Sequence, residues 1–162
     1  MFWFTADTHF NHDNIRRYCE RPFDSVYQMD SEIIRRWNER VKPHDTVIHL
    51  GDFGLLRGER NREYYLNQLN GNLVLIQGNH DKNNSIRSII PCLSINYGGL
   101  NWWCQHHPSY LYPQNLCGHV HNNWKIDKQF DRICVNVGVD AWDFRPVNMR
   151  EIMREIKKEE KI

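Results

Sequence analysis

Three apolar segments of the sequence each end in side chains that are able to bind a metal ion. The segments are residues 2–6, 46–50 and 73–77, and the side chains that follow them are Asp7 and His9, Asp52, and Asn79. Carboxylate, imidazole and amide oxygen groups together suit manganese, iron or zinc, because they are harder than a set of thiolates and softer than an all-oxygen calcium cage. The sequence therefore predicts a transition-metal site.

Three histidines in the second half of the chain extend this set. His119 and His121 are two residues apart, as are Asp7 and His9, so each pair points to one side if the backbone is extended. The full candidate set is Asp7, His9, Asp52, Asn79, His106, His119 and His121. Because this exceeds the four protein ligands of a structural zinc, we expect two ions.

The elements that must position these groups alternate along the first half of the chain. Helices are predicted over 29–40 and 59–69, between the three apolar segments, which read as strands. This β-α-β-α-β order implies a parallel sheet, and ligands bind beyond the carboxyl ends of such strands. We therefore expect the three polar clusters to meet in one crevice.

The second half has a different pattern. Residues 93–97 and 100–105 flank Gly98-Gly99 and predict a hairpin, and further strands are expected at 116–119 and 132–137. After Pro146, an apolar stripe predicts a helix in an outer layer; its residues are Met149, Ile152, Met153 and Ile156. The expected fold class is α/β, with a two-sheet β-sandwich flanked by helices.

Length and composition limit the classes of protein that fit. With 162 residues, the chain has room for a single domain spanning 1–162. A net charge of +1 argues against a dedicated binder of nucleic acids or membrane surfaces, and no apolar run approaches the ~18 residues of a membrane span. The first residues do not resemble a signal peptide, because they lack a basic n-region and a long apolar run. The five cysteines are odd in number and lack a Cys-x-x-Cys pair. We expect a cytoplasmic protein with reduced thiols and no membrane partner.

The order of the polar motifs resembles that of the calcineurin-like metallophosphoesterases, across residues 7–121. The motifs are Asp7-x-His9, Gly51-Asp52, Gly78-Asn79-His80-Asp81, His106 and Gly118-His119-x-His121. The resemblance implies a four-layer α/β/β/α fold and a dinuclear centre bridged by Asp52. It assigns the other ligands of one metal as Asp7, His9 and His121, and those of the second as Asn79, His106 and His119. His106 is preferred to His107 because the family places this ligand two residues before a proline, here Pro108.

The resemblance also implies a reaction. Two divalent cations, most readily Mn²⁺ with iron, Zn²⁺ or Ni²⁺ as alternatives, would lower the pKa of a bridging water, and the resulting hydroxide would attack a phosphate ester in line. His80 is expected to stabilise the transition state or to protonate the leaving oxygen. We expect a small phosphodiester substrate, such as a nucleotide or a nucleic-acid end. A phosphomonoesterase of the same fold and a non-catalytic metal-binding module are the alternatives.

Three residues are candidates for contacts to the substrate. His12 follows the first cluster closely, and Arg21 and Arg57 could each bind a phosphate oxygen, although solvated arginines and capping histidines are common.

In the protein phosphatase branch of the family an aspartate stands three residues after the Gly-Asp motif, where this chain has Leu55. Protein phosphatase activity is therefore disfavoured.

A structural zinc site is the rival explanation for some of these residues. Cys104-x-His106 and Cys117-x-His119 could supply two thiolates and two imidazoles to one tetrahedral ion. This interpretation leaves Asp7, Asp52 and the other strand-end groups unexplained.

Overall fold

The computed structural model of the chain describes residues 1–82 and 85–159. Four helices, one short 3-10 helix and eight strands are found within these ranges. Their bounds are β1 Phe2–Thr5, α1 Asp13–Tyr18, α2 Val26–Arg40, β2 Thr46–His49, α3 Arg62–Leu66, β3 Asn72–Leu75, β4 Cys92–Tyr97, β5 Leu100–Gln105, β6 Gln114–Cys117, β7 Ile126–Gln129, β8 Arg132–Asn136, η1 Val139–Ala141 and α4 Met149–Glu159.

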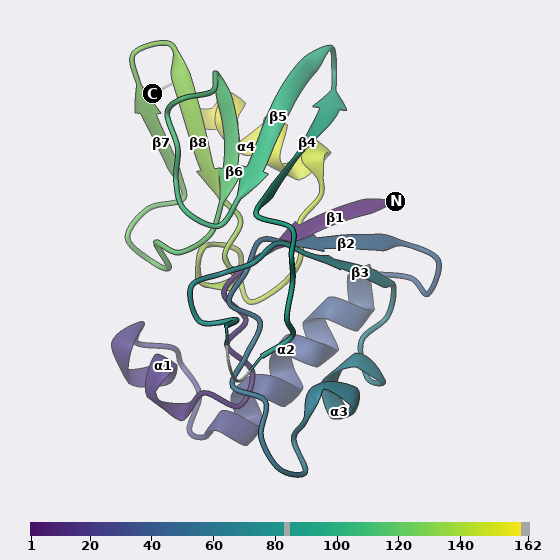
Figure 1. Ribbon diagram of the computed structural model, residues 1–162. Coiled ribbons are helices and arrows are strands. Elements are labelled where there is room, and N and C mark those ends of the chain that lie inside the picture. Colours follow the sequence, from purple (N-terminus) through teal and green to yellow (C-terminus); the bar gives the residue numbers. More distant parts are fainter. Residues whose placement is uncertain (83–84, 160–162) are drawn as a thin grey trace.

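Strands β1, β2 and β3 form a parallel three-stranded sheet in that order, as predicted. α2 and α3 cover one side of this sheet and the five-stranded sheet lies on the other (Figure 1). Side chains alternate accordingly: Trp3 and Val47 pack with Trp37 of α2, while Phe4 and Ile48 belong to the core shared with the second sheet. Burial on both faces explains why these strands are continuously apolar.

The second sheet has the strand order β4-β5-β6-β8-β7 and is mixed. β4 pairs with β5 as the predicted hairpin, β5–β6 and β6–β8 are parallel, and β7 returns antiparallel to β8. Trp102, Leu116 and Val135 contribute its apolar face to the core between the sheets. The predicted α/β class with two sheets and flanking helices is confirmed.

α4 forms where the apolar stripe after Pro146 predicts a helix. Its buried residues Met149, Ile152 and Ile156 belong to the same cluster as Phe4 and Trp102. The helix therefore closes the core between the two sheets, instead of covering an outer layer with a cluster of its own.

Other elements differ from the sequence-based expectation. The helix expected at 59–69 is shorter, because Asn61 accepts a hydrogen bond from the Tyr64 backbone N–H and caps the helix at Arg62. The strand expected at 116–119 lies two residues earlier as β6, and α1, β7 and η1 were not predicted. None of the helices in the described part of the chain combines the length and the hydrophobicity of a membrane span.

Candidate metal centre

The loops after β1, β2, β3 and β6 meet because glycines let their backbones approach one another. A Cβ on Gly78 would lie 2.2 Å from Oδ1 of Asp52, and one on Gly118 would lie 2.6 Å from Oδ2 of Asp7. Any larger residue would force these loops apart. Gly78 and Gly118 are therefore required for their loops to approach the carboxylates of Asp52 and Asp7.

The backbone at the site is unusual at the predicted ligands themselves. Five of them have φ between 49° and 71°, in the left-handed region that non-glycine residues rarely adopt; they are Asp7, His9, Asp52, His119 and His121. Each such residue costs on the order of 1–3 kcal/mol, and such conformations cluster at functional sites, where the surroundings enforce them. The backbone strain therefore indicates that this loop cluster is a functional site.

The first group of candidate ligands contains Asp7, His9 and His121. One potential ligand atom from each lies within 4.8 Å of those of the other two. The rings of His9 and His121 stack with their centroids 5.3 Å apart. These are the three residues that the sequence resemblance groups around one metal.

Asp52 lies between this group and a second one. Its Oδ2 is 3.6 Å from Nε2 of His9 and 3.4 Å from Nε2 of His106. Asp7, Asp52 and His106 also form a group of close potential ligands. The Asp52 carboxylate is thus in position to contact ions on both sides.

The second group is built around Asn79. Its Oδ1 lies 2.8 Å from Nε2 of His106 and 3.1 Å from Nδ1 of His119. Nδ1 of His106 is 2.8 Å from the carbonyl oxygen of Leu50, so this nitrogen carries the donated proton and Nε2 faces the site. His107 also lies close to His106 and His119, but it is exposed, whereas His106 is buried.

Two buried polar atoms show that the groups fit a cation. Oδ1 of Asp7 and Nε2 of His9 have no hydrogen-bond partner among the described residues. Unpaired buried polar atoms are costly, and a lone pair of each is what a metal ion requires. Burial raises the pKa of Asp7 to about 6, although the nearby His106 and His121 oppose the shift. A bound cation would stabilise this carboxylate in its charged form.

The pKa values of His9 and Asp52 are both lowered, but for different reasons. Burial lowers the pKa of His9 well below its ordinary value, which favours the neutral, ligand-competent imidazole. Burial alone would raise the pKa of Asp52, but the hydrogen bond and charge of His106 outweigh it, so this pKa lies below the ordinary value. Asp52 is therefore the carboxylate that stays ionised.

Asp81 holds the two central loops together. Its Oδ2 accepts hydrogen bonds from the backbone N–H groups of Asp52 (2.7 Å) and Gly78 (2.9 Å), and Oδ1 accepts from Phe53 N–H (3.0 Å). The backbone N–H of His80 donates to Oδ1 of Asp52 at 2.8 Å. The exposed His80 imidazole lies edge-on to His9, with ring centroids 5.4 Å apart, at the open side of the site.

The structure places Arg21 behind the site, not at its opening. Arg21 is buried, forms a bidentate ion pair with Asp140 and donates to the carbonyl oxygens of Asp7 and Thr8 at 2.7 and 3.0 Å. Asp140 in turn lies 2.9 Å from Nδ1 of His121. The substrate contact expected of Arg21 is corrected on this geometry, because its donors are used by the protein. Asp140 was missed, since neither motif nor spacing links it to His121.

The other two predicted substrate residues differ in placement. Nδ1 of His12 lies 3.3 Å from Nδ1 of His9, so His12 borders the site. Arg57 is exposed in the loop after β2 and forms a backbone bridge with Arg60. No contact links it to the site among the residues described.

The rival zinc site is not assembled. Within residues 1–82 and 85–159, the groups able to hold a metal include neither Cys104 nor Cys117. Cys117 instead contacts Cys134, with their Sγ atoms 3.5 Å apart, and all five cysteines are free thiols.

His49 is a buried histidine that no motif in the sequence indicates. The Gly51 N–H donates to its Nδ1 at 3.2 Å, so its Nε2 carries the proton and donates to Oγ1 of Thr8 at 3.0 Å. The Thr8 hydroxyl donates to the carbonyl oxygen of Phe53 at 2.7 Å. These hydrogen bonds link the loops after β1 and β2.

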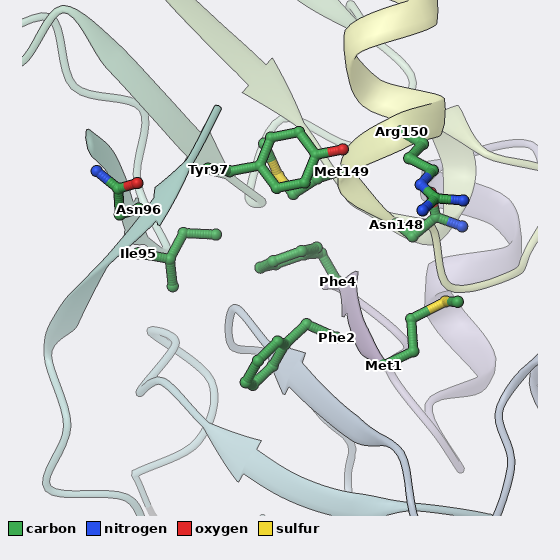
Figure 2. A pocket seen from close by; sticks show the side chains of 9 residues that line it. All are labelled: Met1, Phe2, Phe4, Ile95, Asn96, Tyr97, Asn148, Met149 and Arg150. Atoms are coloured by element: carbon green, nitrogen blue, oxygen red, sulfur yellow. The ribbon is translucent and has the colours of Figure 1, made fainter. Parts of the chain in front are cut away.

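A separate cavity of about 460 Å³ lies at the other end of β1. Figure 2 shows Phe2 and Phe4 of β1 facing Ile95 and Tyr97 of β4, with Met149 at the start of α4. The lining is mainly apolar, and the candidate metal ligands do not contribute to it.

The chain is similar to a known protein family and to known proteins. A family model described as calcineurin-like phosphoesterase matches residues 1–144. The uncharacterized protein MJ1445 of Methanocaldococcus jannaschii is 35% identical, over 94% of this chain and 89% of its own length.

Two solved structures are similar in fold. The protein of unknown function AQ665 from Aquifex aeolicus is 25% identical, with a TM-score of 0.74 over 95% of this chain and 98% of its own. Vps29 of Chaetomium thermophilum is 11% identical, with a TM-score of 0.51 over 83% of this chain and 67% of its own, so it shares the fold alone.

Proposed function

Because this chain belongs to the calcineurin-like phosphoesterase family, we propose that it is a dinuclear metal-dependent phosphoesterase that hydrolyses a small phosphodiester. Mn²⁺ is the preferred metal, with iron, Zn²⁺ or Ni²⁺ as alternatives. The proposed ligands are Asp7, His9 and His121 for one ion and Asn79, His106 and His119 for the other, with Asp52 between them.

The observation that carries the proposal is the position of Asp52. Its Oδ2 lies 3.6 Å from His9 and 3.4 Å from His106, one residue from each ligand group. A carboxylate in this position would be able to serve two ions, whereas a structural zinc site needs no such bridge. The unpaired buried atoms of Asp7 and His9 support the same conclusion.

Two bound cations would supply Lewis-acid activation of water and of the phosphoryl oxygens. The chain's own residues supply the rest. The exposed His80 imidazole is placed at the open side of the site to stabilise or protonate a leaving oxygen, while its backbone N–H fixes Asp52. Asp81 keeps Asp52 and Gly78 in place without reaching the opening.

Metal content and hydrolysis test the proposal together. The purified protein is stripped with a chelator and reloaded with Mn²⁺; bound metal is then counted by elemental analysis, and hydrolysis of bis(p-nitrophenyl) phosphate is followed. We expect up to two exchangeable ions per chain and activity that depends on them. A single tightly held zinc, or no metal at all, would contradict the proposal.

The same assay separates the two alternatives. Faster hydrolysis of p-nitrophenyl phosphate than of the diester would favour a phosphomonoesterase. Full metal loading without hydrolysis of either ester would favour a metal-binding module.

Asp52→Asn provides the internal check. The variant is expected to lose both ions and nearly all hydrolysis, because an amide is a poor bridge between two cations. Asp131→Asn is the matched control, since the Asp131 side chain is 89% exposed on the loop between β7 and β8. Equal metal content in both variants would exclude Asp52 as the bridge.

A further inference from the structure

A cavity of about 300 Å³ opens beside the candidate metal centre. Four imidazoles line one part of it, from His9, His12, His80 and His121. The other part is formed by α1 and by the turn that follows His121. This volume is at the lower end of the range of small-molecule pockets, so it can hold one small organic group beside a phosphoryl group.

The α1 side of the cavity is aromatic and apolar. Ile15 and Cys19 are 4% and 8% exposed and form a buried base, while the ring of Tyr18 is 73% exposed at its mouth. Large exposed aromatic side chains next to a polar site are suited to stacking on a planar ligand. This side therefore favours a flat ring over a charged group.

The opposite side offers amides. Asn122 donates through its side chain to the carbonyl oxygen of Cys19 at 3.2 Å, which leaves its Oδ1 to accept a hydrogen bond. Asn123 is exposed beside it and carries both a donor and an acceptor. Amides match the mixed donor and acceptor edges of nucleobases, and the cavity lining includes no carboxylate that would repel a phosphate ester.

We propose that this cavity is a nucleoside subsite, in which Tyr18 stacks on the base and Asn122 and Asn123 hydrogen-bond to its edge. The inference rests on the proposed phosphoesterase function and names its substrate class as nucleotide esters. The volume suits one nucleoside, so a nucleotide or a chain end fits better than the middle of a duplex.

Two esters with one leaving group test the subsite by activity. The p-nitrophenyl ester of thymidine 5′-monophosphate carries a nucleoside, and methyl p-nitrophenyl phosphate does not. In the Mn²⁺-loaded protein, kcat/KM is expected to be at least about tenfold higher for the nucleotide ester, an effect in the range of one stacked base. Tyr18→Ala should lower the ratio of the two values about tenfold.

Tyr97→Ala is the matched control. Tyr97 is also an exposed tyrosine, but it lines the cavity of Figure 2, at the other end of β1. This variant should keep the wild-type ratio. Equal kcat/KM for both esters in the wild-type protein would overturn the subsite and leave the phosphoesterase function standing.

Binding provides a readout that does not depend on turnover. In the zinc-loaded protein, the side-chain amide NMR signals of Asn122 and Asn123 should shift with thymidine 5′-monophosphate and not with ribose 5-phosphate or inorganic phosphate. Equal shifts with ribose 5-phosphate would identify a sugar-phosphate site and overturn the proposal. Nucleotide-specific shifts without hydrolysis of any ester would support the subsite while rejecting the proposed function.

Discussion

Oδ2 of Asp140 lies 2.9 Å from Nδ1 of His121 and also pairs with the buried guanidinium of Arg21. Because Nδ1 is held in this way, Nε2 is the nitrogen that His121 can offer to an ion. Arg21 also donates to the carbonyl oxygen of Asp7. One buried ion pair therefore orients two candidate ligands from different parts of the chain.

Asp140→Asn is predicted to weaken metal binding about 10–100-fold, the usual effect of removing a carboxylate behind a ligating histidine. The substitution also leaves Arg21 without its charged partner, so the melting temperature should fall. Isothermal titration with Mn²⁺ at a temperature where the variant is folded measures the first effect separately. Unchanged affinity in a folded variant would show that Asp140 does not position His121.

His80→Ala is predicted to keep both metal ions and to lose most of the turnover. Its side chain is exposed and its backbone N–H, which fixes Asp52, survives the substitution. Loss of a general acid or a charge-stabilising group lowers rates about 10²–10⁴-fold. Metal content by elemental analysis and kcat on an aryl phosphodiester check the prediction together, and a loss smaller than about tenfold with full metal content would refute the role.

Gly78→Ala is predicted to disrupt the centre by steric conflict. Its Cβ would lie 2.2 Å from Oδ1 of Asp52 and 2.3 Å from the Asp52 backbone nitrogen, so the loops must separate. We expect a loss of about 1–3 kcal/mol of stability and weaker metal binding. Gly58→Ala is the control, because a Cβ there meets no atom within 4 Å and only its positive φ opposes the change. Urea denaturation and metal titration of both variants measure the difference.

The pH dependence of stability is predicted to depend on His49. Burial lowers the pKa of His49 from 6.5 to about 3, so the native protein binds fewer protons there than the unfolded chain between these values. The contribution of neutral His49 to the free energy of unfolding is therefore complete above pH 6.5. This contribution falls as the pH drops below 6.5, by about 1.4 kcal/mol per pH unit.

His49→Gln is expected to flatten this dependence while lowering stability at pH 7, because glutamine does not titrate. The measurement is the free energy of unfolding in urea at pH 7.5 and 5.0, in chelator-treated protein. His44→Gln, at an exposed histidine, should keep the wild-type slope. If His49→Gln keeps that slope as well, His49 is not the group responsible.

Much of this architecture follows from sequence patterns, because the relevant signals are local. Continuous apolar runs predicted β1, β2 and β3, and the polar residues after them indicated where a site would form. α1 was missed because it has six residues, of which only Ile15 is buried, too few to show a periodic stripe. β7 was missed because Ile126–Gln129 is mostly polar, as an edge strand tolerates.

The support of the site could not be derived in this way. Arg21 and Asp140 are 119 residues apart in the sequence. Their ion pair is therefore visible only in the folded chain. The role of His49 is equally hidden, because a histidine inside an apolar strand has no spacing that reveals its partners. Side-chain types predicted the candidate ligands. Which other polar groups are buried behind them depends on the tertiary structure, which the sequence pattern does not show.

The candidate ligands are divided between the two sheets: Asp7, Asp52 and Asn79 follow strands of the three-stranded sheet, while His106 and His119 follow strands of the other. Ions bound among them would therefore act as cross-links between the two sheets. Without these cross-links, the two sheets would be held together chiefly by apolar packing. Metal loading should therefore raise the stability of the whole molecule as well as enable the reaction.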